Sequence, residues 1–230
     1  MEYLISTVDA AWPHVEAALE KNDSIHVRAY GVLPVTEEFI RKVTTQILRR
    51  SGRDDLITTA SMLLKELTVN AAKANFKRVI FREHNIDSDN AEQYEQGMTI
   101  FKDNLSDDMP YVYGPKAKRN DLHVLIAISS DKNKLHIEVQ NNTPMKKHEE
   151  QRVREKLALA MSCEDLGDFM MNHGDDSEGA GLGIFLSLAA LKAAGVDPRV
   201  FVIKTDGKKR TWASFELPID RSYKPELPRY

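Results

Sequence analysis

The chain has 230 residues, 42% of them hydrophobic, which is enough to bury the core of one large domain or two small ones. Its 32 basic and 35 acidic residues leave a net charge of −3, which argues against nucleic acid as the main partner. The single cysteine, Cys163, excludes an internal disulfide and favours a reducing compartment. No stretch approaches the roughly 18 apolar residues of a membrane span, and segment 1–23 lacks the basic start of a signal peptide. We therefore expect a cytoplasmic protein that binds neither nucleic acid nor membrane.

The first part of the chain predicts one strand and two helices. Residues 24–32 alternate apolar and polar side chains, as in a strand with one buried face. A helix is predicted to follow from Thr36, as its N-cap, to Gly52, a residue type that commonly ends helices. The longest helix is predicted over about 54–81, because its apolar residues recur at helical spacing. Its buried stripe is predicted to comprise Leu63, Leu67, Ala71 and Ala74.

Three polar residues share one face of this long helix. Glu66, Asn70 and Lys73 stand at positions i, i+4 and i+7, at the margin of the buried stripe. A carboxylate, an amide and an amine so aligned have the chemistry to hold a metal ion and a phosphate. The alternative is an ordinary solvated helix face.

Residues 82–121 are predicted to form a polar insertion. Within it, one short helix carries an apolar stripe, which Gly97 weakens by roughly 1 kcal/mol relative to alanine. The stripe either packs on the side of the domain or forms a surface for a partner or a second copy of the chain, as in a homodimer. Residues 106–121 are rich in proline, glycine and aspartate and are predicted to be loop. The stripe comprises Ala91, Tyr94, Met98, Phe101 and Leu105.

Two hairpins are predicted in the second half of the chain. In the first, apolar residues alternate on both sides of a turn at 131–133, and the second hairpin turns near Asp206. Asn141 continues the series of Ile137 and Val139, so strand parity predicts that its side chain lies on the covered face. A buried amide needs a hydrogen-bond partner, which is either a ligand or a backbone group.

A glycine-rich stretch stands between the two hairpins. Gly179, Gly181 and Gly183 lead into an apolar run at helical spacing that ends at Gly195. Free N–H groups and the helix dipole favour an anion at such a helix start, and glycine lets a phosphate approach the backbone. A tight turn before a core helix is the alternative.

Taken in chain order, these motifs resemble those of the Bergerat-fold (GHKL) ATP-binding domain. The long helix carries E-x-x-x-N-A-x-K, the first hairpin ends in V-x-N-N-x-P, and the glycine stretch reads G-x-G-L-G. Histidine kinases, gyrase B subunits, mismatch-repair ATPases and certain chaperones share that domain, and histidine kinases are the most similar. The resemblance implies an α/β two-layer sandwich (α+β), with helices on one face of a mixed, mostly antiparallel sheet. It covers residues 24–219, flanked by the N-terminal segment 1–23 and a tail at 220–230.

The resemblance also implies roles for individual residues. Asn70 resembles the asparagine that coordinates Mg²⁺ between the ATP phosphates, and Glu66 resembles the acid that polarises the attacking water or hydroxyl. Lys73 would face the phosphates, and residues 145–178 would form the lid over the nucleotide. The phosphate loop would include Gly179, Gly181, Leu182 and Gly183.

One motif departs from the family pattern. The family has D-x-G-x-G after the hairpin strand, where the aspartate binds the adenine amino group. Here Asn141 replaces that aspartate, and Thr143 and Met145 replace the two glycines. The amide keeps an acceptor oxygen but loses the charge, so Asn141→Asp is expected to tighten ATP binding if the base enters. If Thr143 and Met145 close the pocket instead, the same change is expected to bury an unpaired carboxylate and lower stability without any gain in affinity.

Two functions are therefore carried forward from the sequence. The first is an ATP- and Mg²⁺-binding signalling protein that acts on, or binds, a separate protein partner, as anti-sigma serine kinases of this fold do. It would be an ATPase or a protein kinase, and none of its seven histidines stands in a phosphoacceptor sequence. The second is a non-catalytic interaction module that keeps the fold with weak or no nucleotide binding.

Overall fold

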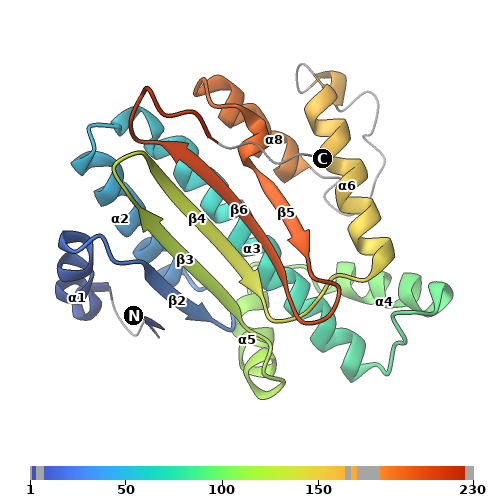
Figure 1. Cartoon of the computed structure of the whole chain (residues 1–230). Helices are drawn as coiled ribbons and strands as arrows, with labels where there is room; N and C mark the ends of the chain where they lie inside the picture. The colour runs from blue at the N-terminus through green and yellow to red at the C-terminus, as the bar shows by residue number, and fades with distance from the viewer. Residues whose placement is uncertain (1, 4–7, 164–166, 170–181, 226–230) are drawn as a thin grey trace.

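A six-stranded open sheet forms one layer of the structure (Figure 1). The structure is a computed structural model, and it describes residues 2–3, 8–163, 167–169 and 182–225. Within these ranges the strand order is β1-β2-β3-β4-β6-β5; β1 pairs parallel to β2, and every other neighbouring pair is antiparallel. The strands are β1 (Glu2–Tyr3), β2 (Ile25–Ala29), β3 (Val124–Ser130), β4 (Lys134–Asn141), β5 (Val202–Thr205) and β6 (Thr211–Pro218).

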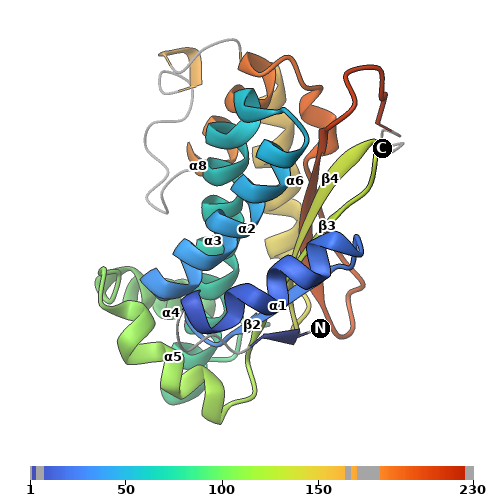
Figure 2. The same ribbon diagram turned by 90° about the vertical axis from the view of Figure 1, so that its left-hand side faces the viewer.

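Helices make the second layer, on one face of the sheet. Figure 2 shows α2, α3 and α8 on the same side of the strands, which confirms the expected mostly antiparallel sheet with helices over one face. The helices are α1 (Val8–Glu20), α2 (Pro34–Arg50), α3 (Ile57–Glu83), α4 (Ala91–Asp103), α5 (Met109–Arg119), α6 (Lys147–Ser162) and α8 (Leu182–Ala193).

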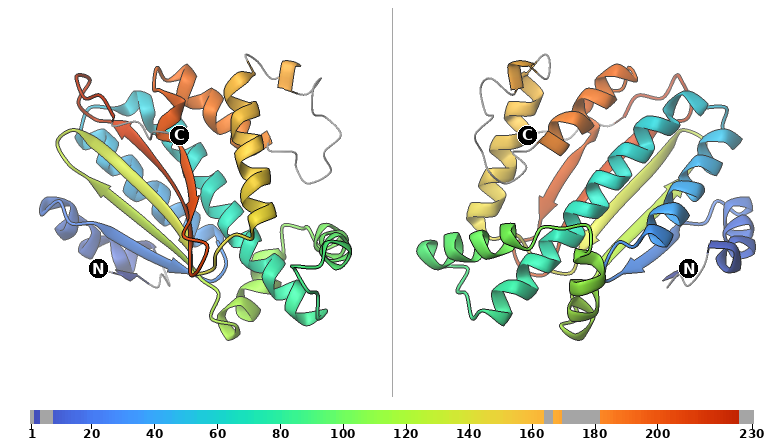
Figure 3. Two further views of the ribbon diagram at one scale, coloured as in Figure 1. Left: turned by 45° about the vertical axis from the view of Figure 1, so that its right-hand side comes forward. Right: turned by 180° about the vertical axis from the view of Figure 1, so that it is seen from behind.

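The main core lies between these two layers. Alternate residues of β3 and β4 are buried, as the period of two predicts, and Ile126, Ile137 and Val139 point into the core. From the helix side, Leu63 and Leu67 of α3 meet them. Each such side chain stabilises the fold by roughly 1.5–3 kcal/mol when fully buried. This packing holds α3 against the sheet. The right-hand view of Figure 3 shows α3 lying across the strands.

A second core forms where α4 and α5 pack against the C-terminal half of α3. Tyr94 and Met98 of α4 are buried there against Phe76 and Ile80. The central residues of the predicted stripe, Tyr94 and Met98, are thus packed within the domain. Leu105, which lies beyond the end of α4, is exposed. Gly97 is required at this crossing, because a Cβ there would lie 2.7 Å from the ring of Phe81.

The prediction of a loop over 106–121 was wrong, because α5 occupies Met109–Arg119. Pro110 stands in the first turn of that helix, where its missing N–H breaks no helical hydrogen bond. The helix then passes close to the backbone of Gly31, at which a Cβ would lie 2.9 Å from the carbonyl oxygen of Pro110. Tertiary packing therefore overrides the turn-forming composition of this segment.

The first helix of the domain also starts earlier than predicted. Helix α2 begins at Pro34, with Leu33 rather than Thr36 at the N-cap, since proline is well suited to the first helical position. Its end agrees with the prediction, because Gly52 follows with a φ of +64°. Segment 1–23 contributes α1, whose Val15 is fully buried in the main core. Within the described ranges, no helix combines the length and the apolar character that crossing a bilayer requires.

Candidate functional site

A cavity of about 300 Å³ brings together the separate sequence motifs. It lies between α3, the end of β4 and the β5–β6 pair, with α6 and the start of α8 at its sides. Glu66 and Asn70 of α3, Asn141 of β4 and Gly183 of α8 all line it. The helix motif, the strand motif and the described part of the glycine motif therefore meet at one place.

Glu66 and Asn70 interact directly along one face of α3. The Nδ2 group of Asn70 donates a hydrogen bond of 2.6 Å to Oε1 of Glu66. Within the described part of the chain, Oδ1 of Asn70 accepts no hydrogen bond, and the Asn70 side chain is exposed. The pair therefore presents an amide oxygen and a carboxylate oxygen to the cavity.

Gly183 stands at the start of α8, directly against this pair. A Cβ at Gly183 would overlap the carboxylate of Glu66, so the helix start lies directly against this side chain, and a larger residue would require Glu66 to turn away. Leu182 lines a neighbouring groove rather than the cavity. Gly179 and Gly181 lie outside the described residues, as do parts of the expected lid, 164–166 and 170–178.

Lys73 faces that neighbouring groove, not the cavity that holds Asn141. The groove has a volume of about 480 Å³, lies between α3, α4 and the start of α8, and shares Glu66 and Asn70 with the cavity. The side chain of Lys73 is exposed and forms no ion pair with any described residue. Lys73 therefore lies near the Glu66–Asn70 pair, but on the side of the pair that faces the groove and not the cavity.

Asn141 lies on the covered face of β4, as strand parity predicted, and its amide is held by α3. Its Nδ2 donates to the carbonyl oxygen of Ala71 at 2.8 Å and to Oδ1 of Asn75 at 2.9 Å. Its Oδ1 accepts no hydrogen bond from the described residues. Thr143 also lines the cavity, and its buried hydroxyl has no partner in the described structure. Two polar groups near the end of β4 are thus available to a ligand.

An ion-pair cluster that the sequence analysis missed closes one side of the cavity. Lys77 and Arg78 of α3 both pair with Glu149, in the first turn of α6. Burial raises the pKa of the Glu149 carboxyl, but attraction to Lys77 and Arg78 and hydrogen bonds from Lys77 and the Lys146 backbone outweigh it and lower the pKa to about 2. The Glu149 carboxyl is therefore ionised, and its ion pairs with Lys77 and Arg78 hold the first turn of α6 against α3. The signal in the sequence is that Lys77 continues the spacing of Glu66, Asn70 and Lys73.

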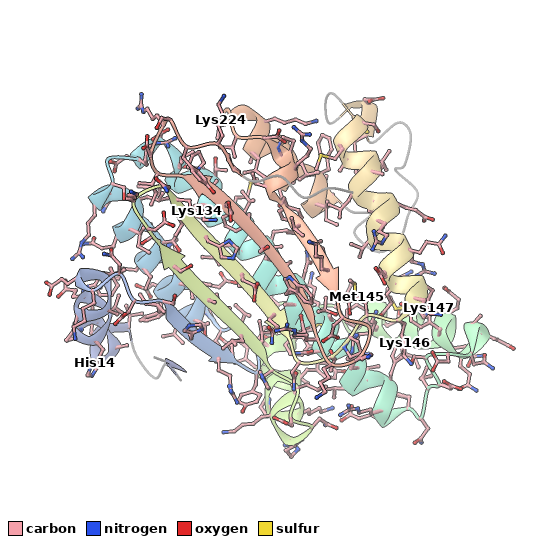
Figure 4. All side chains as sticks on the ribbon, in the orientation of Figure 1. His14, Lys134, Met145, Lys146, Lys147 and Lys224 are labelled. Carbon is pink, nitrogen blue, oxygen red and sulfur yellow. The ribbon has the colours of Figure 1, made fainter. Side chains whose placement is uncertain are left out.

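Helix α6 also contributes a cation to the cavity. Lys156 is half-buried, lines the cavity and forms no ion pair with any described residue. The left-hand view of Figure 3 shows α6 beside β5. Residues of both elements line the cavity. Met145 lines the cavity where the chain approaches α6, next to Lys146 and Lys147 (Figure 4). Thr143 and Met145 therefore narrow the cavity without filling it.

The donors near Asn70 suit a hard cation that a ligand helps to hold. Among the described residues, no group of three or more His, Cys, Asp or Glu side chains could bind a metal ion alone. Asn70 and Glu66 nevertheless offer oxygen atoms, which Mg²⁺ prefers, and Mg²⁺ commonly takes its other ligands from phosphates and water. A metal at this position thus requires a phosphate-bearing ligand.

Comparisons with known proteins give one similarity without a function. No protein-family model matches the chain, and no solved structure matches it. The chain is 30% identical over 204 residues to an uncharacterised protein of Treponema pallidum (strain Nichols). The match covers 89% of this chain and 39% of that protein, so the chain spans less than half the length of the relative.

Proposed function

We propose that this chain is an ATP- and Mg²⁺-binding signalling domain of the Bergerat (GHKL) type, related to histidine kinases, that acts on a separate protein partner. One observation carries the proposal. A single cavity is lined by Glu66 and Asn70 from α3, Asn141 from β4 and Gly183 from α8. These are the elements and the chain order that the sequence motifs imply for such a site.

The walls of the cavity differ in a way that suits a nucleotide. Val139, Phe201 and Ile203 supply an apolar surface beside Asn141, on which a flat base can lie. Asn70, Lys156 and the start of α8 supply an amide, a cation and helix N–H groups for phosphates. The volume of about 300 Å³ is at the small end for ligand pockets, which typically measure roughly 300–1,000 Å³.

Asn70 is the residue that would hold Mg²⁺ through its free Oδ1. Its Nδ2 is engaged by Glu66, so the oxygen points away from that hydrogen bond. The cation would neutralise charge on the phosphates. Lys73 lines the adjoining groove rather than the cavity, so it would meet the phosphates only where they extend past Asn70 into that groove.

Glu66 is the candidate general base. Its carboxylate lies against the start of α8 and is one helical turn from Asn70. There it would accept the proton of an attacking water or of a hydroxyl on the partner protein. The reaction is therefore ATP hydrolysis or transfer of a phosphoryl group to a partner.

The second candidate function is a non-catalytic interaction module. It is favoured by Thr143 and Met145, which take up space at the base end of the cavity, and by the neutral side chain of Asn141. In that case the fold would be retained and the chain would bind its protein partner without nucleotide.

Calorimetric titration of the chain with ATP, with and without Mg²⁺, separates the two functions. The proposal requires saturable ATP binding that Mg²⁺ strengthens. Asn70→Ala should weaken binding of Mg·ATP more than binding of metal-free ATP. Lys65→Ala is the control, because Lys65 is an exposed residue of α3 that lines neither the cavity nor the neighbouring groove. Absence of ATP binding by the wild-type chain would favour the interaction module instead.

Turnover tests the role of Glu66 separately. Glu66→Ala should abolish ATP hydrolysis or phosphoryl transfer while ATP binding stays nearly intact, because a general base acts in the transition state. Normal turnover by this variant would exclude Glu66 as the base.

The chain is not expected to phosphorylate itself, because none of its seven histidines stands in a phosphoacceptor sequence. Purified protein incubated with labelled ATP should therefore carry no acid-labile label on histidine.

A further inference from the structure

The amide of Asn141 has only one orientation in this structure. The carbonyl oxygen of Ala71 can only accept a hydrogen bond, so the group beside it must be Nδ2 of Asn141. The second hydrogen of Nδ2 goes to Oδ1 of Asn75. Both donors are therefore used inside the protein, and Oδ1 of Asn141 is what the side chain offers to the cavity.

Asn75 is an unusual residue for its surroundings. It lies one helical turn after Ala71, is fully buried and does not line the cavity. Its own Nδ2 is buried without a hydrogen-bond partner in the described structure, which lowers stability. An apolar side chain would avoid that loss but would leave the second hydrogen of Asn141 Nδ2 without an acceptor, so the asparagine here serves Asn141.

We propose that Asn75 is a positioning residue that fixes Asn141 with its acceptor toward the ligand and thereby makes the site selective for a base with an exocyclic amino group. The inference rests on the proposed function and specifies its substrate. The preferred base is adenine, and hypoxanthine, which has an oxo group in place of the amino group, is rejected.

The chemistry follows from the direction of the hydrogen bonds. An amino group donates to Oδ1 of Asn141, whereas an oxo group places one acceptor against another. Rotating the amide to suit the oxo group would break both hydrogen bonds to α3 and set two oxygen atoms together at Ala71. The hydroxyl of Thr143 can donate or accept, so it adapts to either base. Discrimination therefore depends on Asn141 and on the partner that holds it.

The wild-type chain is tested first, by calorimetry with three nucleotides in the presence of Mg²⁺. These are ATP, inosine triphosphate and purine riboside triphosphate, which has neither the amino nor the oxo group. We expect ATP to bind about tenfold more tightly than inosine triphosphate, with purine riboside triphosphate between them. Equal dissociation constants for ATP and inosine triphosphate would overturn the inference and leave the proposed function standing. Binding of none of the three would overturn the proposed function itself.

Variants of Asn75 then test its role. Asn75→Leu removes one of the two anchors, so the ratio of the two dissociation constants should fall at least about threefold. Asn75→Asp keeps an acceptor at the same place and should retain the ratio. Thr68→Val is the matched control, since Thr68 is a fully buried polar residue of α3 that does not line the cavity. An unchanged ratio in Asn75→Leu, or a ratio lost in Asn75→Asp, would refute the role.

Discussion

Gly183 and Glu66 are in contact where the start of α8 meets α3, so closely that a Cβ on the glycine would overlap the carboxylate. The two residues are more than a hundred positions apart in the sequence, and each belongs to a different motif. The contact places a helix N-terminus beside the candidate base and the candidate metal ligand. A side chain at position 183 would therefore change the position of the Glu66 carboxylate.

Gly183→Ala should displace Glu66 and weaken binding of Mg·ATP. Because the methyl group meets the end of a flexible, half-buried side chain that can turn away, the loss of stability should stay below about 1 kcal/mol. The loss should be smaller in a Glu66→Ala background, because the carboxylate that the methyl group meets is then absent. Denaturant unfolding of the two single variants and the double variant measures this coupling without any ligand. Additive losses in the three proteins would show that the contact does not govern the position of α8.

Acid should unfold the chain partly through Glu149. The pKa of this carboxyl is lowered from 4.5 to about 2 in the folded state, so its contribution to stability is present above pH 4.5 and is lost as the pH falls through about 2. The contribution is on the order of 3 kcal/mol. Glu149→Gln should remove this acid dependence and lower stability at neutral pH, since Lys77 and Arg78 lose their shared anion.

Glu150→Gln is the matched control for that variant. Glu150 is the next residue along α6 and pairs with Arg154 one turn later near the surface, an interaction worth roughly 0.3–0.5 kcal/mol. The melting temperature should be measured for both variants between pH 2 and pH 7. Its fall at acid pH should be reduced in Glu149→Gln and should stay as in the wild type in Glu150→Gln. Retention of the wild-type acid transition in Glu149→Gln would exclude this carboxyl as its source.

Local periodicity was sufficient to predict the elements that carry the site. The period of two in 134–141 predicted that Asn141 lies on the covered face, because alternation along a strand is independent of its neighbours. The spacing of four predicted that Glu66 and Asn70 lie together, and the structure joins them by a hydrogen bond. Both relationships lie within one element, which is why the sequence alone was enough.

Contacts between elements could not be predicted in this way. Asn75 lies on the same helix as Asn70, but its function depends on which strand residue crosses above it. Glu149 looks like an ordinary acid in a first helical turn until α6 is placed against Lys77. The helix α5 was missed for the same reason, since the packing of Gly114 near Gly31 has no signal in the local sequence.

Gly97→Ala should destabilise the protein although alanine is the better helix former. Helix propensity favours alanine by about 1 kcal/mol, but the added Cβ would lie 2.7 Å from the ring of Phe81. That ring is buried and packs edge-on against Tyr94, so it cannot move without disturbing the second core. We expect a net loss of about 1–2 kcal/mol by denaturant unfolding. Gln96→Ala, at an exposed position of the same helix, should change stability by less than about 0.5 kcal/mol, and a more stable Gly97→Ala protein would contradict this packing.

Asn141→Asp should destabilise the chain rather than tighten ATP binding, which is the second of the two outcomes expected from the sequence. The amide nitrogen of Asn141 faces two acceptors, the carbonyl oxygen of Ala71 and Oδ1 of Asn75. An ionised carboxylate would place an oxygen against both of them, at a position where the residue is 6% exposed. We expect a loss of about 2–4 kcal/mol at neutral pH.

The pH dependence of this loss identifies its cause. Because the folded protein disfavours the charged form, the pKa of the new carboxyl should be raised above its unfolded value of about 3.9. The variant should therefore be closest to wild type below that pH and lose stability as the pH rises through the folded pKa. Asn90→Asp is the control, since Asn90 is an exposed N-cap of α4 and aspartate caps a helix equally well. If Asn141→Asp melted at the wild-type temperature at pH 7 and bound ATP more tightly, the hydrogen bonds of Asn141 to α3 would not be what determines the identity of this residue.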